Sequence, residues 1–183
     1  MILGLDISSS KVGIAVIDEN KKIIMLKLVK FEKEPLENKA LVLSEEFKQI
    51  KKKYKIKDIF IEEPISIYAR GKSTAHVISV LQRFNGMCSL MCRLVYGDIP
   101  TLINSRKART LADVKIPGRL KSKEIKKIII EEMSKRYQKD FPTPKTKFGN
   151  YKPGTDDKAD ALVVALAGHK LISLDNLTKK MYI

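Results

Sequence analysis

The sequence begins with three apolar segments joined by very short turns, and this spacing restricts the fold more than any other feature. The segments cover residues 2–8, 11–18 and 21–31, and small or polar residues separate them. Connections this short join neighbouring antiparallel strands, because a parallel pair needs a crossover of a dozen residues or more. The sequence therefore predicts an antiparallel three-stranded meander at its N-terminus.

Helices and strands alternate through the rest of the chain. Apolar residues recur at helical spacing over about 35–54, and a buried strand at 56–63 ends before Pro64, which cannot continue a strand ladder. A long apolar helix is predicted at about 74–95. Further predicted elements are a short strand within 97–105, a small basic helix at 106–112, a helix at 122–137 with Ser122 as its N-terminal cap, an irregular excursion at about 137–155 and a helix from 156 to about 174.

Antiparallel strands followed by strands that alternate with helices predict an α/β protein, with a mixed five-stranded sheet and helices on both faces. This order of elements is that of an RNase H-like domain. The 183 residues suit one domain with a full core, and neither an internal repeat nor a second domain is visible. We therefore predict a single RNase H-like domain over residues 1–183.

Four carboxylates occur where a packed domain would not normally place them. Asp6 interrupts an apolar N-terminal run, Glu62 ends an apolar strand, and Asp157 and Asp160 open the last helix. A buried carboxylate without a partner loses its hydration and gains nothing in return. Oxygen ligands of this kind are those that Mg²⁺ and Mn²⁺ prefer. The four residues are therefore candidate ligands of a divalent metal.

Local spacing supports this hypothesis more strongly for some of the four residues than for others. Asp157 and Asp160 are three residues apart, so both lie on one helix face, which is the face that packs on the sheet. Without a metal, Asp160 would need a buried Lys or Arg partner. Asp6 could instead satisfy a turn through the neighbouring serines. Glu62 and Glu63 lie on opposite faces of their strand, and strand parity alone does not choose between them.

The chain is strongly basic, with a formal net charge of +15 and a pI near 9.7. Residues 105–152 contain fifteen Lys or Arg and five Asp or Glu, so about a quarter of the chain carries an excess of ten positive charges. A general lysine bias would spread the charge more evenly. Acidic candidate ligands within a cationic body indicate a metal-dependent nuclease that binds nucleic acid.

Cys88 and Cys92 are the only cysteines, and they lie one helical turn apart in an apolar stretch. This placement predicts buried thiols in a reducing compartment rather than a metal site or a disulfide. No signal peptide is visible, and no apolar run is long and unbroken enough to cross a membrane. We expect a soluble, cytoplasmic protein, which would be in the host cytoplasm if the source is a virus.

Three blocks of the sequence resemble the catalytic blocks of the RuvC-type Holliday junction resolvases. The blocks are ILGLDISSSKVGIAVID at 2–18, IFIEE at 59–63 and DKADALVVALAGH at 157–169. The resemblance runs from Met1 to about Leu171, and the last block is the most specific because its D-x-x-D-A-L-x-x-A spacing matches the family. The resemblance implies that the metal ligands are Asp6, Glu62, Asp157 and Asp160.

The resemblance also implies an endonuclease that resolves four-way DNA junctions by paired nicks, made symmetrically by a homodimer and leaving 5′-phosphate and 3′-hydroxyl ends. Two Mg²⁺ or Mn²⁺ ions per active site would activate water and stabilise the leaving oxygen, with Asp6 as the bridging ligand. Arg109 and the segment 121–123 correspond to basic positions that the family uses against phosphates. The predicted nucleic-acid contacts are Tyr68, Arg70, Lys72, Arg106, Lys107, Arg109, Arg119, Lys121 and Lys123.

Two departures from the family pattern affect junction selectivity. The family often places an aromatic residue shortly after its catalytic Glu, whereas this chain has Ile65 there and Tyr68 slightly later. Tyr68 is therefore the predicted residue that stacks near the junction centre. The excursion at 137–155 is longer than the corresponding bacterial loop, and together with the lysine content it points towards a viral or phage branch.

Three other functions fit parts of the sequence. An RNase H-like nuclease could act on flaps, other branched DNA or RNA–DNA hybrids instead of four-way junctions. A sugar-kinase or Hsp70-type ATPase begins with a similar strand and turn, but this chain is too short for two lobes and lacks the second phosphate loop. A catalytically inactive DNA-binding scaffold is disfavoured, because all four carboxylates are present.

The apolar surface of the helix at 74–95 is wider than one sheet can cover. Its Val, Ile, Leu, Met and Phe residues occupy more than the roughly 100° stripe that packing on a sheet requires. A two-fold related copy of the same helix is the simplest second partner. We therefore predict a homodimer formed through this helix, and the alternative is a fully enclosed core helix in a monomer.

Overall fold

The computed structural model of the chain describes residues 1–64 and 74–181. Its centre is a five-stranded sheet with the strand order β3-β2-β1-β4-β5. The strands β1 (Ile2–Ser8), β2 (Lys11–Ile17) and β3 (Ile23–Lys30) form the predicted antiparallel meander, β4 (Asp58–Glu62) runs parallel to β1, and β5 (Thr101–Ile103) runs parallel to β4. The predicted mixed five-stranded sheet is confirmed.

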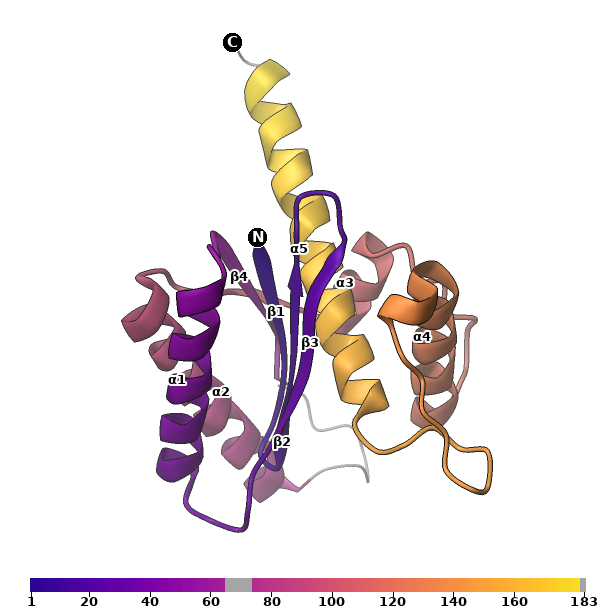
Figure 1. Cartoon of the computed structure of the whole chain (residues 1–183), viewed down its shortest axis with the longest axis horizontal. Coiled ribbons are helices and arrows are strands. Elements are labelled where there is room, and N and C mark those ends of the chain that lie inside the picture. Colours follow the sequence, from indigo (N-terminus) through magenta and orange to yellow (C-terminus); the bar gives the residue numbers. More distant parts are fainter. Residues whose placement is uncertain (65–73, 182–183) are drawn as a thin grey trace.

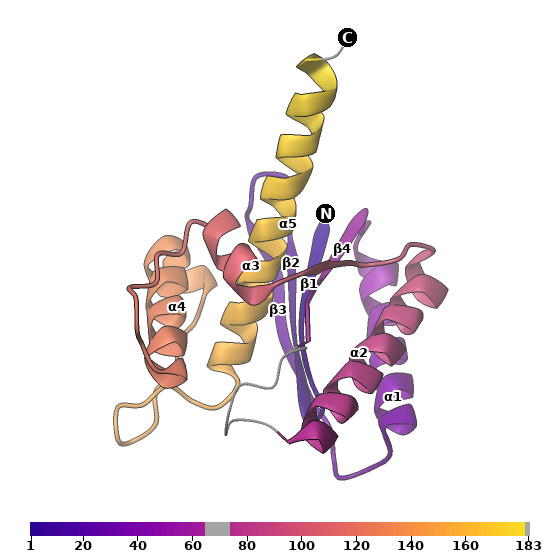
Figure 2. The same ribbon diagram turned by 180° about the vertical axis from the view of Figure 1, so that it is seen from behind.

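Helices cover both faces of the sheet, as predicted. Figure 1 shows α1 and α2 on one face and α5, with α3 and α4 beyond it, on the other, and Figure 2 shows the same layers from behind. None of the described helices is both long and apolar enough to cross a membrane. The helices are α1 (Leu36–Lys53), α2 (Ala75–Tyr96), α3 (Ser105–Leu111), α4 (Ser122–Tyr137) and α5 (Thr155–Met181), with the 3-10 turn η1 (Gln138–Asp140) after α4.

Two predicted helix ends are wrong. The last helix continues to Met181 instead of ending near Leu174, because four of its seven further residues are good helix formers and a solvent-exposed helix needs no sheet beneath it. Figure 1 shows this end of α5 projecting past the sheet. Ser122 is the first residue of α4 and not its cap. Lys121 occupies the N-cap position, and its backbone N–H donates to the Glu124 carboxylate with an N···O distance of 2.7 Å.

The alternation of side chains along β1 and β4 creates two separate cores. Leu3 and Leu5 point towards α1 and α2, where Phe84 is fully buried. Ile2 and Phe60 point the other way and pack in the core that contains α5. Cys88 and Cys92 are buried on the α2 side and form no disulfide, which confirms the predicted buried thiols.

Two glycines allow α5 to lie unusually close to the sheet. A Cβ on Gly4 of β1 would collide with the backbone of α5 at Ala161 and Ala165, and a Cβ on Gly13 of β2 would collide with the backbone carbonyl of Asp157. No side chain can separate the helix from the strands at these points. The first turns of α5 are therefore held directly against β1, which carries Asp6, and against its neighbour β2.

Candidate active site

Parallel pairing brings Asp6 and Glu62 to the same edge of the sheet. Leu5 pairs with Ile61, and the two carboxylates follow one residue later on adjacent strands. Glu62 shares a strand face with Phe60, whose ring lies where a Cβ on Gly168 of α5 would be. Glu62 therefore lies on the α5 side.

Glu63 has the opposite environment. It is exposed, and its backbone N–H donates to the carbonyl oxygen of Ile103 at 2.9 Å. The structure therefore places Glu62, and not Glu63, on the sheet face that carries Asp6.

The first turns of α5 supply the remaining carboxylates. Asp6 is the register partner of Gly13, and Gly13 is the position at which the Asp157 backbone meets β2. Asp157 is only 4% exposed, whereas Asp6, Glu62 and Asp160 are partly buried. The fold thus gathers the four predicted carboxylates from two strands and one helix.

Burial and mutual repulsion control the protonation of these groups. Burial raises the pKa of Asp6 well above its usual value, and the charges of Glu62, Asp160 and Asp157 raise it further. Burial and the Glu62 charge raise the pKa of Asp160 to about 7. Burial also raises the pKa of Glu62, although the positive charges of Arg109 and Lys126 oppose this effect. Asp6 therefore lies within the electrostatic reach of the other three carboxylates, and Asp160 lies within that of Glu62 and Asp157.

Two lysines that the sequence did not single out pair with the start of α5. Lys11 Nζ lies 2.5 Å from Asp157 Oδ2, and Lys126 Nζ lies 2.6 Å from Asp156 Oδ2. Burial alone would lower the pKa of Lys126, but its hydrogen bond to Asp156 and the nearby carboxylates raise it. Burial would likewise raise the pKa of Asp156, and the hydrogen bond and charge of Lys126 lower it. Lys126 is therefore held as a cation among acidic groups.

The donor chemistry of the site fits a divalent cation. Hard oxygen ligands are what Mg²⁺ and Mn²⁺ prefer, and a cation would relieve the repulsion that raises the pKa values of Asp6 and Asp160. Within residues 1–64 and 74–181, no group of three or more His, Cys, Asp and Glu side chains is already placed to hold a metal ion. The carboxylates would have to turn towards the ion on binding, and Asp157 would have to exchange Lys11 for it.

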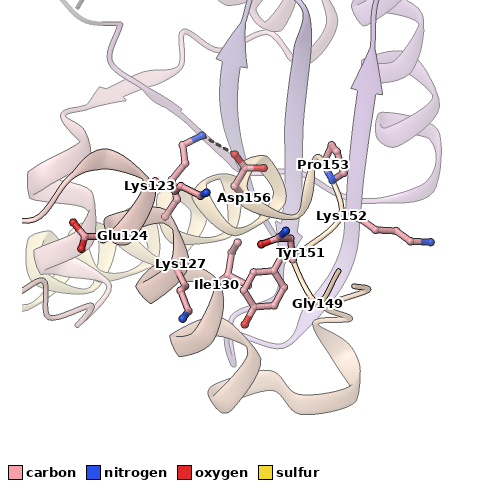
Figure 3. A pocket seen from close by; sticks show the side chains of 11 residues that line it. Lys123, Glu124, Lys127, Ile130, Gly149, Tyr151, Lys152, Pro153 and Asp156 are labelled. Carbon is pink, nitrogen blue, oxygen red and sulfur yellow. Dashed lines mark hydrogen bonds and ion pairs between the residues drawn. The ribbon is translucent and has the colours of Figure 1, made fainter. Parts of the chain in front are cut away.

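Three neighbouring clefts surround this cluster. The carboxylate cleft has a volume of about 360 Å³, and its lining includes Glu62, Asp160, Arg109 and Lys126. The arginine cleft, of about 390 Å³, shares Arg109 with it. The lysine cleft, of about 550 Å³, shares Lys126 with it and lies between α4 and the segment 149–153 (Figure 3).

The predicted nucleic-acid contacts are distributed over these clefts and the adjoining surface. Arg106, Arg109 and Arg119 line the arginine cleft, and Lys123 lines the lysine cleft. Lys107 and Lys121 are exposed on α3 and at the start of α4. Three predicted contacts lie outside the described residues, namely Tyr68, Arg70 and Lys72.

Lys11, Lys126 and Lys152 were missed as site residues. Lys11 and Lys126 have no distinguishing local pattern, because their roles come from long-range pairing with α5. Lys152, which lines the lysine cleft, belongs to the segment KTKFGNYK, where lysines and aromatic residues are interleaved. That interleaving is typical of nucleic-acid contacts and could have indicated the cleft.

Comparison with solved structures identifies the fold. The structure resembles T. thermophilus RuvC in complex with a Holliday junction substrate, with a TM-score of 0.63, 13% identity and 94% of each chain covered. Thermus thermophilus RuvC alone gives a TM-score of 0.59 at 12% identity, covering 95% of this chain and 96% of that chain. The yeast mitochondrial Holliday junction resolvase Ydc2 gives 0.54 at 17% identity, covering 98% and 83%.

This chain has the RuvC fold. The predicted resemblance and the predicted RNase H-like fold class are therefore confirmed at the level of the fold. No protein-family model matches the sequence, and no curated protein sequence matches it. The likeness to the RuvC fold therefore lies in the backbone and in the three short sequence blocks. Sequence identity to the three solved structures is only 12–17%.

Proposed function

We propose that this protein is a metal-dependent endonuclease that resolves four-way DNA junctions by paired nicks. The observation that carries the proposal is the meeting of Asp6, Glu62, Asp157 and Asp160 from β1, β4 and α5, within a RuvC fold and between two basic clefts. The arrangement supports phosphodiester hydrolysis, because acidic groups for a metal lie beside cationic surfaces for phosphates.

The four carboxylates would hold Mg²⁺ or Mn²⁺, as two ions per site. When bound, the metal supplies an activated water and neutralises the charge that develops on the phosphate and the leaving oxygen. A hydrogen bond within α3 orients the Arg109 side chain, because its Nε donates to the Ser105 carbonyl oxygen at 3.0 Å. The guanidinium would then bind a phosphate. Lys126 places a second positive charge on the wall of the same cleft.

The scissile phosphate would enter the carboxylate cleft between Arg109 and Lys126. Burial raises the pKa of Glu62, and the positive charges of Arg109 and Lys126 oppose that rise, so both charges act on the acidic cluster. Phosphate contacts of this kind position the backbone without reading the base sequence. The arginine and lysine clefts on either side would then hold the nucleotides that flank the cut.

Cleavage of defined substrates tests the proposal. With Mg²⁺, the protein should nick a four-way junction in preference to linear duplex, a flap and an RNA–DNA hybrid of the same sequence. Asp6→Asn and Asp160→Asn should abolish cutting while DNA binding is kept or becomes tighter, and Glu62→Gln should lose far more activity than Glu63→Gln. Cutting by either Asp variant at the wild-type rate would refute the site. Preference for the flap or hybrid would assign the alternative nuclease function.

We also propose that the active unit is a homodimer formed through α2. Leu90 and Leu94 lie one turn apart on α2 and are 53% and 68% exposed, and Leu41 of α1, which is 62% exposed, lines the same groove as Leu94. The opposite face of α2 is buried against the sheet through Phe84 and Cys88. The helix thus has an apolar face beyond the one that the sheet covers, as the sequence predicted, and a two-fold partner would bury it.

A dimer would present two cleavage sites to a substrate that itself has two-fold symmetry, so paired nicks would follow from geometry. A cytoplasmic location, where a nucleic-acid substrate and Mg²⁺ are both present, belongs to the same proposal.

A further inference from the structure

The excursion between η1 and α5 contains a small hairpin that is closed by a single antiparallel bridge. Lys145 and Tyr151 pair as an antiparallel bridge, and the backbone N–H of Lys152 donates to the Pro144 carbonyl oxygen at 2.8 Å. At the tip, the N–H of Gly149 donates to the carbonyl oxygen of Thr146 at 3.0 Å. We call residues 144–152 the basic hairpin, since it contains three lysines and no acidic residue.

The tip of the basic hairpin presents an aromatic ring to solvent. Phe148 is 77% exposed, and Gly149 beside it has a φ of +78°, which closes the turn and leaves the ring outside. Large aromatic side chains normally bury 150–250 Å² in a core or an interface. No packing within the described structure accounts for Phe148, so the ring is available to a partner.

Lysines lie over both aromatic rings of the hairpin. Lys147 Nζ is 5.0 Å from the centre of the Phe148 ring, and Lys145 Nζ is 5.6 Å from the centre of the Tyr151 ring. A flat apolar surface beside positive charges matches a nucleotide, which offers a base to stack and a phosphate to neutralise. An apolar protein surface would match the ring but would leave the lysines without counter-charges.

The hairpin also lies on the route to the acidic cluster. Tyr151 and Lys152 form one wall of the lysine cleft, and Lys123 and Lys127 of α4 form the other. Figure 3 shows the Tyr151 ring beside Ile130 within this cleft and Asp156 at its far end. Lys126 lines both this cleft and the carboxylate cleft, so a nucleic-acid strand held at the hairpin continues towards Asp160.

We infer that the basic hairpin is a nucleic-acid contact element in which Phe148 stacks on an unpaired or displaced base while Lys145, Lys147 and Lys152 contact the adjacent phosphates. The inference rests on the proposed action on branched DNA, and it names the hairpin as a site of branch recognition. Branched DNA exposes base faces at its branch point, whereas linear duplex hides them in the stack. Phe148 therefore contributes to selectivity for branched over linear DNA.

A single tryptophan can report this contact directly. The chain has no Trp, so Phe148→Trp places the only indole at the hairpin tip. Ile99→Trp is the matched control, because Ile99 is also 77% exposed but lies beside Asp58, at the opposite end of β4 from Glu62. With a four-way junction in EDTA, emission of the Phe148→Trp protein should fall by roughly half or more through base stacking, and that of the control should stay nearly constant.

Binding measurements separate stacking from charge. Phe148→Ala should weaken junction binding about 5- to 150-fold, the range of one base–aromatic stack, with little change for linear duplex and no change in salt dependence. Phe148→Tyr should restore binding to within about threefold. Lys147→Ala should weaken binding to both DNAs and reduce the slope of log affinity against log salt by about one.

Each contrary outcome has a distinct meaning. Equal junction binding by wild type and Phe148→Ala, with no quenching at position 148, would overturn the hairpin inference and leave the proposed nuclease function intact. A change in oligomeric state on Phe148→Ala without a change in DNA affinity would reassign the ring to contact between copies of this chain. Failure of the wild type to bind any DNA would refute both proposals.

Discussion

Replacing Asp160 by Asn should make the metal-free protein more stable, although Asp160 is predicted to be essential for activity. Burial and the neighbouring Glu62 charge raise the pKa of Asp160 to about 7, from an ordinary value of 3.8. The folded state therefore disfavours the ionised carboxylate, whereas the unfolded chain does not. An amide of the same shape keeps the packing and removes the charge.

The size and pH dependence follow from the two pKa values. The difference between a pKa of 3.8 in the unfolded chain and about 7 in the folded protein corresponds to about 4 kcal/mol, which is the upper limit for the gain in unfolding free energy above pH 7. Asp6 and Glu62 share the same repulsion, so part of the penalty is already relieved by proton uptake elsewhere in the cluster, and we expect about 1–3 kcal/mol.

A raised carboxyl pKa stabilises the folded state fully below the unfolded pKa, and this contribution is lost as the pH rises through the folded pKa. The difference between Asp160→Asn and wild type should therefore be near zero at pH 4 and should grow towards pH 7–8.

Urea unfolding followed by circular dichroism, in EDTA from pH 4 to pH 8, measures this difference. Asp175→Asn is the control, because Asp175 is exposed on the same helix and its replacement should change stability by less than about 0.5 kcal/mol. Adding Mg²⁺ should stabilise the wild type more than Asp160→Asn, since only the intact cluster binds the ion fully. An Asn variant that is equally or less stable than wild type at pH 8 in EDTA would refute this electrostatic account of the site.

Three further predictions address the scaffold, the basic surface and the dimer. Gly13→Ala should destabilise the fold by about 1–3 kcal/mol in the same urea assay and should reduce cutting, because the added Cβ collides with the Asp157 backbone. The control Gly86→Ala should stabilise the fold by about 0.5–1 kcal/mol, because its Cβ points into open space on α2. Leu94→Lys should convert a dimer into a monomer in sedimentation at micromolar concentration, and a wild type that already sediments as a monomer while cutting junctions would exclude the dimer. Replacing Arg109, Lys121 and Lys123 together by Ala should weaken binding to all DNA and flatten its salt dependence. Unchanged affinity of this triple variant would show that the DNA-binding surface lies elsewhere.

The sheet and its helices could be predicted because their patterns are local. Short turns predict an antiparallel meander, and apolar residues recur at helical spacing in the sequences of α1, α2 and α5. The end of α5 could not be located in the same way, since its last turns lack the core contacts that make an amphipathic pattern visible. The basic hairpin was concealed for a similar reason, because a single antiparallel bridge between Lys145 and Tyr151 leaves no alternating pattern.

The choice between Glu62 and Glu63 shows where sequence reasoning stops. Alternation along β4 places the two residues on opposite faces, but it does not say which face carries Asp6. Contact between Phe60 and Gly168 decides this, since it turns the Glu62 side of β4 towards α5. The ion pairs of Lys11 and Lys126 with α5 are equally non-local, because they join residues 146 and 30 positions apart.

These ion pairs partly neutralise the acidic groups at the start of α5, within a basic protein that we propose binds phosphates. The Asp160 carboxylate is ionised above pH 7, so a phosphate entering the cluster without a metal would there face repulsion from the carboxylates and attraction in the clefts on either side. DNA could therefore dock along the arginine and lysine clefts before its backbone reaches the carboxylates. Neutralising one acidic residue, as in Asp160→Asn, should then tighten metal-free DNA binding while it abolishes cutting. Opposite changes in affinity and activity from one substitution are what distinguish a catalytic cluster embedded in a binding surface from a cluster that serves the fold alone.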